Sequence, residues 1–235
     1  MMRIPVLDKG FVELIDHLGD DHTVVAAARV SYLQESKGEE KDKKLIQYML
    51  KHQHSTPFEH VTFQLRIKAP VVTWWQLIRH RTFSFNLQSG RYTEFDEDEY
   101  YTPGEWRVQS KSNKQASEQN LFIERLGGSE RSIRDIYESV FEFCFGVYEE
   151  MLKSNVAKEQ ARLVLPFAAL YYTGYITADL RNLLHFIELR NTQEAQYEIR
   201  VYAEAVENII KDICPWTYES WKEINTVSAR GYTVQ

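Results

Sequence analysis

The sequence is poor in cysteine and has no long hydrophobic run. Its 235 residues include two cysteines, too few for a disulfide framework. Cys144 lies between two phenylalanines and Cys214 precedes a Pro-Trp pair, so neither has the neighbouring cation that would make its thiol a nucleophile. No stretch of about 18 apolar residues predicts a membrane span, and the first residues lack a signal-peptide core. We therefore expect a soluble, cytoplasmic protein without a catalytic cysteine.

Several binding motifs are also missing. Neither standard glycine-rich phosphate loop is present, which argues against a Rossmann dinucleotide site and against a nucleoside triphosphatase. No Ser-His-Asp hydrolase motif occurs. Residues 52–60 hold three histidines and a carboxylate, but their spacing matches no metal-ligand motif, and a polar loop lining a ligand site fits better. The net charge of -6 argues against a general nucleic-acid-binding surface.

The hydrophobic pattern predicts one domain of helices and at least one strand. Residues 61–68 alternate apolar and polar side chains, as a half-buried strand does. Helices are expected over residues 23–32, 43–51, 133–152, 178–190 and 195–213, and Pro70 can begin another at Val71. Residues 93–128 are acidic and then polar, with few large apolar side chains. They predict a mobile surface excursion from the single domain at 1–235.

The most informative stretch is a cationic cluster, Arg79-His80-Arg81, placed at the expected end of the helix that begins at Val71. Adjacent cations repel by on the order of 1–3 kcal/mol per pair near a protein surface, and apolar flanks on both sides limit their access to water. A bound anion would offset this repulsion. The next dozen residues favour a phosphorylated ligand, because they add hydroxyls, an amide, a flexible backbone and a second guanidinium: Ser84, Asn86, Ser89, Gly90 and Arg91. The alternative is a solvated basic loop between two buried elements.

The predicted helix 178–190 carries polar residues on two flanks of an apolar stripe. At about 100° per residue, Asp179 and Arg190 share one flank, while Arg181, His185 and Glu188 share the other. Taken alone, these residues also fit an ordinary polar helix surface. Arg162 precedes a strongly apolar run and, taken alone, fits a buried ion pair better than a ligand contact.

The pattern R-H-R-x-x-S-x-N-x-x-S-G-R-Y at residues 79–92 resembles the signature of the flavin-dependent thymidylate synthases, which methylate dUMP without a cysteine nucleophile. Other family blocks are resembled in the same order: A-R-V-S at 28–31, H-x-T-P-F-E-H at 54–60, A-R-x-V-L-P at 161–166, N-L-x-H-F-x-x-L-R at 182–190 and C-P-W at 214–216. Only residues 100–128 lack a clear counterpart.

The resemblance implies an α+β domain with a twisted antiparallel sheet and flanking helices, assembled as a homotetramer whose sites lie between subunits. FAD would be held by Thr56, Glu59, Arg79, His80, Arg81, Leu87, Asp179, Leu180, Arg181 and His185. The nucleotide dUMP would be held by Gln76, Arg79, Leu87, Gln88, Ser89, Gly90, Arg91, Arg162 and Arg190.

The resemblance also implies that NADPH reduces the FAD and that 5,10-methylenetetrahydrofolate donates the carbon. Arg190 would be the catalytic residue, because a guanidinium stabilises negative charge on the N3/O4 edge of uracil and so makes C5 nucleophilic. No metal, nucleic acid or membrane partner is implied.

Two positions depart from the family pattern. Many members carry Glu or Gln directly after Asn86, where this chain has Leu87 followed by Gln88, and many carry Asn in place of Asp179. Two other functions fit parts of the sequence. One is an NADPH:flavin oxidoreductase without a uridylate pocket, which would need neither Arg162 nor Arg190. The other is an RNA-binding module with Trp74 or Trp75 stacking on bases, against which the acidic net charge counts.

Overall fold

The computed structural model of the chain describes residues 2–111 and 117–229, and its centre is an antiparallel sheet of five strands. The strand order is β1-β2-β3-β7-β4, so strands far apart in the sequence are neighbours. Their bounds are β1 (Arg3–Val6), β2 (Gly10–Leu18), β3 (Thr62–Pro70), β4 (Ser84–Leu87) and β7 (Tyr171–Asp179). With the helices around it, this sheet forms a single α+β domain, as expected.

The central strand β3 shows why one face of the sheet is the core. Its inward side chains, Phe63, Leu65 and Ile67, are buried, whereas Gln64 and Arg66 between them are exposed. This is the alternation that predicted a strand at 61–68. Leu65 is paired with Ile176 of β7, another buried residue, so the apolar faces of the two strands coincide.

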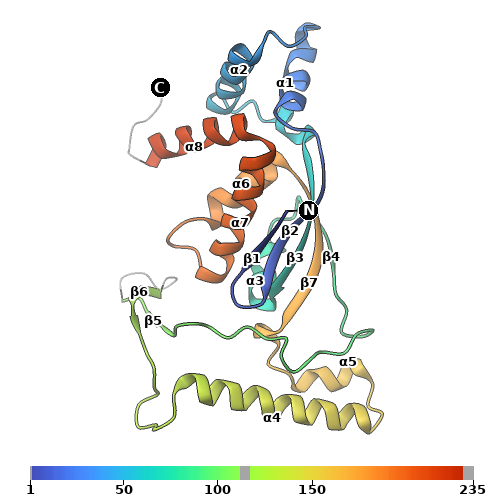
Figure 1. Ribbon diagram of the computed structural model, residues 1–235, viewed down its shortest axis with the longest axis vertical. Coiled ribbons are helices and arrows are strands. Elements are labelled where there is room, and N and C mark those ends of the chain that lie inside the picture. The colour runs from blue at the N-terminus through green and yellow to red at the C-terminus, as the bar shows by residue number, and fades with distance from the viewer. Residues whose placement is uncertain (1, 112–116, 230–235) are drawn as a thin grey trace.

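Helices cover that apolar face. Figure 1 shows α6, α7 and α8 beside the sheet, with α1 and α2 at one end of the molecule and α4 and α5 at the other. The bounds are α1 (Asp21–Arg29), α2 (Glu39–Lys51), α3 (Val71–Leu77), α4 (Ile133–Lys153), α5 (Lys158–Ala161), α6 (Leu180–Arg190), α7 (Tyr197–Ile213) and α8 (Pro215–Ala229). Short 3-10 turns are η1 (Val30–Tyr32), η2 (Thr56–His60), η3 (Arg162–Val164) and η4 (Phe167–Ala169).

The predicted helices all exist, but several bounds were wrong. The helix expected from residue 178 begins at Leu180, because Ala178 and Asp179 complete strand β7. Residues 30–32 form a 3-10 turn rather than the end of α1, and α2 begins four residues before the expected 43. Helix α7 begins at Tyr197 rather than at residue 195. Strands β1, β2, β4 and β7 and helix α8 were not predicted.

The excursion at 93–128 is partly ordered by contacts with the domain. Phe95 and Tyr101 are buried, and the backbone N–H of Tyr101 donates to the carbonyl of Ala169 at 2.9 Å. Further on, β5 (Arg107–Gln109) and β6 (Ser117–Phe122) form a separate two-stranded sheet. The expected lack of apolar anchors is therefore wrong for the first part, while mobility itself stays a prediction and residues 112–116 lie outside the described residues.

An acidic side chain of α1 ties the two ends of the fold together. The buried Asp21 accepts hydrogen bonds from the backbone N–H of Trp216 at 2.7 Å and of Thr217 at 3.0 Å, and from the Thr217 hydroxyl at 2.6 Å. These are among the first N–H groups of α8, which have no partner inside their own helix. Asp21 therefore caps α8 from another helix.

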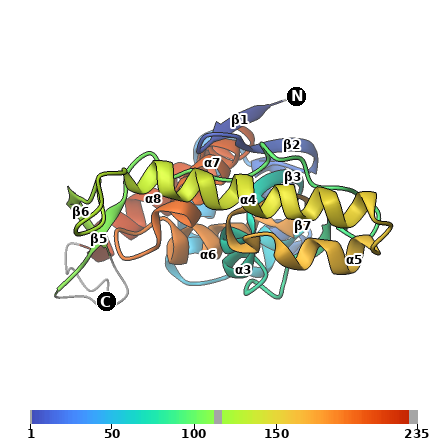
Figure 2. The ribbon, with the colours of Figure 1, turned by 90° about the horizontal axis from the view of Figure 1, so that it is seen from below.

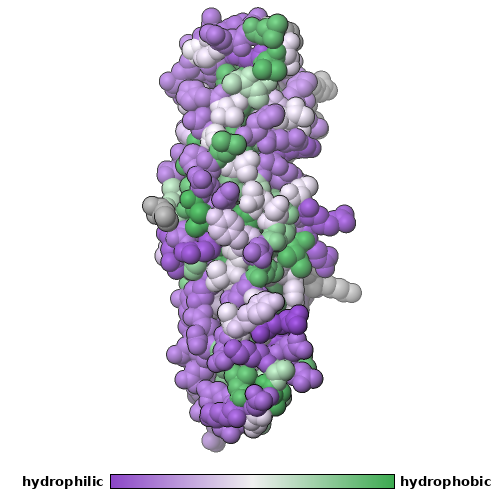
Figure 3. Space-filling model, turned by 90° about the vertical axis from the view of Figure 1, so that its right-hand side faces the viewer, coloured by the Kyte–Doolittle hydropathy of each residue, from purple (hydrophilic) through white to green (hydrophobic). Residues whose placement is uncertain are grey.

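Most of the surface in view is hydrophilic, with separate apolar spots near both ends and the middle of the face in Figure 3. Exposed apolar side chains include Val30 and Leu33 near α1 and Phe143 on α4. Within the part of the chain that the structure describes, no helix combines the length and apolar character needed to cross a membrane.

Candidate active site

The Arg79-His80-Arg81 cluster lies directly after α3, where the helix end leaves two arginines at the surface. Helix α3 follows Pro70 and is fixed by buried Trp74 and Leu77. Arg79 and Arg81 are exposed, but His80 between them is only 8% exposed. The three residues therefore do not act as one cationic surface. The histidine belongs to the interior and the arginines remain available to a ligand.

His80 contacts Arg190 from α6. Nε of Arg190 donates a hydrogen bond to Nε2 of His80 at 3.3 Å, and the rings of Phe83 and Phe186 lie 5.5 and 5.0 Å from the imidazole. Burial, together with the charges of Arg190 and His185, lowers the pKa of His80 from 6.5 to about 4. A neutral imidazole with its proton on Nδ1 is the form that can accept at Nε2.

This contact determines which part of Arg190 a ligand can use. A guanidinium has five N–H donors in a fixed plane. The donor on Nε is directed at His80, so the two terminal nitrogens remain for another group. His80 was expected among the FAD contacts and Arg190 at the uracil ring, and the structure brings these two residues together within one chain.

A second group of predicted residues forms around Gly90. A Cβ atom at Gly90 would lie 2.7 Å from the ring of Phe95 and 3.0 Å from Nη1 of Arg162, so no other residue fits without displacement. Nε of Arg91 is 3.0 Å from the carboxylate of Glu159, and the Ser89 hydroxyl accepts from the N–H of Arg91 at 3.3 Å. Two guanidinium groups thus flank a turn with a close-packed backbone.

Strand β4 leads into this turn and accounts for the unusual Leu87-Gln88 pair. Leu87 packs over Gly174 of β7, where an added Cβ would lie 2.4 Å from the leucine side chain. The carbonyl of the Gln88 side chain accepts from the N–H of Thr173 at 3.2 Å, extending the β4–β7 pairing. Both side chains therefore have structural contacts, and only part of each is available to a ligand.

The predicted FAD residues of η2 and α6 form a third group. Arg181 pairs with Glu59, and both are exposed, as is Thr56 at the start of η2. Asp179 is the N-cap of α6, where it accepts from the N–H of Asn182 at 2.9 Å and from its side-chain amide at 2.6 Å. Its carboxylate, unusual at this position, is thus used to begin the helix. Leu180 is fully buried, so it supports the group through packing.

A groove of about 1200 Å³ opens beside this third group. It lies between the end of α2, residues 52–55, α6 and α8, and its polar lining includes His52, His54, Arg181, Asn182 and His185. It exceeds the roughly 300–1,000 Å³ that drug-sized ligands occupy. Among the residues that the structure describes, no three His, Cys, Asp or Glu side chains gather as metal ligands would.

The residues that contact Gln76 were not predicted from the sequence. The Gln76 amide, near the end of α3, donates to the side chain of Gln196, which donates to buried Glu198. Glu198 shares the apolar face of α7 with Tyr202 and Ala205, at positions i+4 and i+7. A carboxylate in such a stripe needs a buried partner, and this pattern could have identified Glu198.

Comparisons with known proteins bear on the family of the whole chain. The family described as Thymidylate synthase complementing protein matches residues 13–216. A flavin-dependent thymidylate synthase of Thermosipho melanesiensis is 44% identical over 224 residues, which are 95% of this chain and 95% of that protein. The corresponding protein of Thermus thermophilus is 44% identical over 222 residues, covering 94% of this chain and 79% of its own length.

The fold is also similar to that of a solved structure. The crystal structure of the UMP/dUMP methylase PolB from Streptomyces cacaoi, bound with 5-Br dUMP, has a TM-score of 0.79 and 31% sequence identity. The similarity covers 94% of this chain and 97% of that one.

Proposed function

The chain belongs to the flavin-dependent thymidylate synthase family, and on this basis we propose that it converts dUMP to dTMP in the cytoplasm. The carbon donor is 5,10-methylenetetrahydrofolate, the hydride carrier is FAD and the reductant is NADPH. The contact between His80 and Arg190 is the observation on which the assignment of residue roles depends. This contact holds the guanidinium of Arg190, a permanent cation, in a defined place, and its two terminal nitrogens remain able to donate to a ligand.

Arg190 is the residue we assign to the uracil ring. Methylation at C5 requires electron density there, and negative charge on the N3/O4 edge provides it when a fixed positive group is nearby. Arginine remains protonated at any accessible pH, so it stabilises this charge without giving up a proton. Neutral His80 fixes the guanidinium by accepting from Nε, at no cost in charge repulsion.

We assign the phosphate of dUMP to the group around Gly90. Arg91 and Arg162 supply the two cations, and Ser89 supplies a hydroxyl. Guanidinium groups bind phosphate in a bidentate manner, and the missing side chain at Gly90 lets the Arg162 guanidinium lie directly against this turn. Gln76, Arg79, Leu87 and Gln88 complete the proposed nucleotide site.

The third group suits FAD. Its groove of about 1200 Å³ is large enough for a dinucleotide, and exposed Arg181 can meet the pyrophosphate. We propose that FAD contacts Thr56, Glu59, Arg181 and His185, with Arg79 and Arg81 adding positive charge. His80, Leu87, Asp179 and Leu180 shape the site, the last two through the start of α6. When bound, FAD supplies the reducing hydride of the reaction.

Neither cysteine is assigned a chemical role. Cys214 is 0% exposed, and burial, followed by the charges of Asp21 and Asp20, raises the pKa of its thiol. Cys144 lies on α4 beside aromatic residues. A nucleophilic thiolate needs access and a nearby cation, so the proposed reaction proceeds without one.

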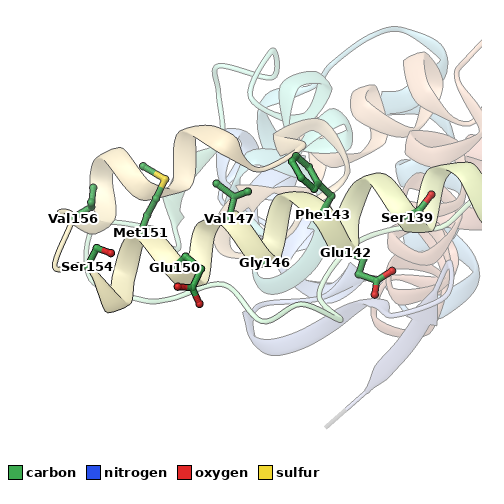
Figure 4. A pocket seen from close by; sticks show the side chains of 9 residues that line it. All are labelled: Ser139, Glu142, Phe143, Gly146, Val147, Glu150, Met151, Ser154 and Val156. Atoms are coloured by element: carbon green, nitrogen blue, oxygen red, sulfur yellow. The ribbon is translucent and has the colours of Figure 1, made fainter.

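We propose that the active protein is a homotetramer with sites shared between copies. In Figure 4, Phe143, Val147 and Met151 project from one side of α4, along a groove of about 760 Å³. Phe143 is 71% exposed, and a second copy of the chain would remove this apolar surface from water. In Figure 1, α5, directly before Arg162, lies well away from α6, which ends at Arg190. A second copy would allow both arginines to meet one nucleotide.

Tritium release from [5-³H]dUMP, measured together with NADPH consumption, tests the proposed function. The wild-type protein should release tritium when 5,10-methylenetetrahydrofolate is present. Arg190→Ala should reduce release at least about 100-fold, as the removal of one stabilising charge in other enzymes does, while much of the NADPH oxidation remains. Arg181→Ala, on the FAD side, should instead lower FAD content. Near-normal tritium release by Arg190→Ala would exclude the assigned role, and wild-type NADPH oxidation without any release would indicate a plain oxidoreductase.

A further inference from the structure

A chain of hydrogen bonds connects Gln76 to the excursion between residues 93 and 128. Nε2 of Gln76 donates to Oε1 of Gln196 at 2.7 Å, and Nε2 of Gln196 donates to Oε2 of Glu198 at 2.8 Å. The other oxygen of Glu198 accepts from the Tyr101 hydroxyl at 3.0 Å and from Nη2 of Arg107 at 2.7 Å. The chain therefore begins at a residue of the nucleotide site and ends at a buried carboxylate.

The buried end fixes the direction of every bond in this chain. An ionised carboxylate can only accept hydrogen bonds. Burial would raise the pKa of Glu198, but hydrogen bonds from Arg107 and Gln196 outweigh burial and hold the pKa below its ordinary value. Gln196 must therefore turn its nitrogen to Glu198 and its oxygen to Gln76. Gln76 in turn directs its nitrogen to Gln196, which leaves its oxygen and one N–H for a ligand.

Contacts between the excursion and the rest of the domain hold the groups that pair with Glu198. The Tyr137 hydroxyl donates to the carbonyl of Tyr101 at 2.6 Å, and the Tyr101 N–H donates to Ala169 at 2.9 Å. Arg107, at the start of β5, also lies over the ring of Tyr197 at 5.0 Å. Figures 1 and 2 both place β5 on the side of the molecule where the chain enters α7. Gln196 makes no capping bond to α7, so its side chain serves as a bridge.

We propose that Gln196 and Glu198 are positioning residues of the nucleotide site, which act by fixing the orientation of the Gln76 amide. Tyr101 and Arg107 hold Glu198 in place by donating hydrogen bonds to its carboxylate. An amide that is free to rotate by 180° presents nitrogen or oxygen about equally, whereas this chain selects one arrangement. The proposal rests on the proposed function only in that Gln76 must face dUMP.

The chain predicts opposite consequences for single and paired substitutions. In Glu198→Gln, Arg107 and Tyr101 still donate to one atom at position 198, so the oxygen stays there and the new nitrogen faces Gln196. Gln196 and then Gln76 must reverse, which puts the nitrogen of Gln76 where its oxygen was. In Gln196→Glu, two carboxylates face each other and the chain breaks. The double variant Gln196→Glu/Glu198→Gln restores every bond, because the new amide at position 198 donates to the new carboxylate at position 196, which also accepts from Gln76.

The experiment measures the dissociation constant of dUMP for the FAD-loaded protein by the change in flavin absorbance. One mismatched hydrogen bond costs about 1–1.5 kcal/mol, so each single variant should bind dUMP about five- to tenfold more weakly. The double variant should return to within about twofold of the wild type. Gln193→Glu, in the same exposed loop, adds the same charge outside the chain of bonds and should change the constant less than about twofold.

The outcomes separate this proposal from the proposed function. A wild-type protein that does not bind dUMP would overturn the proposed function itself. With normal wild-type binding, a double variant as weak as the weaker single variant would overturn the positioning role, as would unchanged affinity in Glu198→Gln. Thermal unfolding verifies that each variant is folded. If variants of buried Glu198 do not fold, Gln196→Met removes both hydrogen bonds of the Gln196 side-chain amide at an exposed position. Unchanged dUMP affinity in Gln196→Met would reject the proposal.

Discussion

At the level of the single residue, burial decides the charge of His80. The unfolded chain takes up a proton on this residue near pH 6.5, whereas the folded protein does so only near pH 4. Between these values the unfolded state binds more protons, so the free energy of unfolding contributed by His80 is present above about pH 6.5 and is lost as the pH falls.

We expect this loss to reach about 2 kcal/mol at pH 5. Urea unfolding of the wild type and of His80→Gln at pH 7 and pH 5 measures this loss. The free energy of unfolding of the variant should fall by about 2 kcal/mol less than that of the wild type. His17→Gln, which changes an exposed histidine, is the control and should behave as the wild type. Equal losses for the wild type and His80→Gln would show that His80 is not kept neutral by the fold.

The two cysteines make a second prediction at this scale. Cys144→Ala/Cys214→Ala should retain dTMP synthesis within about twofold, because neither thiol is assigned to the reaction. It should be less stable by about 1 kcal/mol, chiefly from Cys214, which packs against the core while Cys144 is only partly buried. FAD content and thermal unfolding verify that the variant is folded. A folded, FAD-loaded variant without turnover would show that one of the two thiols takes part in the reaction.

At the level of the element, helix α8 depends on Asp21. Asp21→Ala removes the acceptor for two N–H groups and one hydroxyl, so we expect a loss of roughly 2–3 kcal/mol in stability. Asp212→Ala, at an exposed position near the end of α7, is the control and should cost less than about 0.5 kcal/mol. Hydrogen exchange at the Trp216 and Thr217 amides should become faster in the Asp21 variant. Unchanged exchange would show that the cap is not needed.

Elements whose signal is local could be predicted from the sequence, and elements set by distant partners could not. Strand β3 alternates within eight residues, and α4 and α7 carry long apolar stripes, so each was found with small errors in its bounds. Strand β7 pairs with β3 on one side and β4 on the other, and burial alternates along it. Two of its buried positions are the small residues Gly174 and Ala178, so its apolar signal in the sequence is weak. Helix α8 relies on a cap 195 residues away from Trp216 in the sequence.

The residues of the proposed site also differ in whether their signal is local in the sequence or depends on distant partners. The motif at 79–92 predicts anion-binding residues from local chemistry alone, and that assignment stays a prediction. The pairing of His80 with Arg190 joins residues 110 positions apart, and the hydrogen bond that Arg107 donates to Glu198 joins residues 91 apart. No spacing rule reports such contacts. They follow from the packing of α3, α6 and α7.

At the level of the whole molecule, shared sites can be tested with two inactive variants. Arg162→Ala and Arg190→Ala should each lack dTMP synthesis. If one chain supplies Arg162 and another supplies Arg190, tetramers formed by co-refolding both variants contain some sites with two wild-type arginines. Activity should then return to a fraction of the wild-type value.

The control is each variant refolded alone, which should remain inactive. If a single chain supplies both arginines, every site in the mixture contains one lesion. Verified mixed tetramers without regained dTMP synthesis would reject sharing of this pair between chains, while the chemistry assigned to each arginine would stand.

The bond between Asp21 and Thr217 also has a consequence for how the protein is made. The two residues are 196 positions apart, and ribosomes add about 5–20 residues per second. Asp21 is therefore synthesised roughly 10–40 seconds before its partner. Until residue 179 has been made, the nascent chain also lacks β7, the strand that pairs with β3. The helices that cover the apolar face of β3 are made later still, so that face stays open to solvent on the ribosome. Synonymous codons that slow translation before residue 171 should prolong this exposure and increase capture of the nascent chain by chaperones.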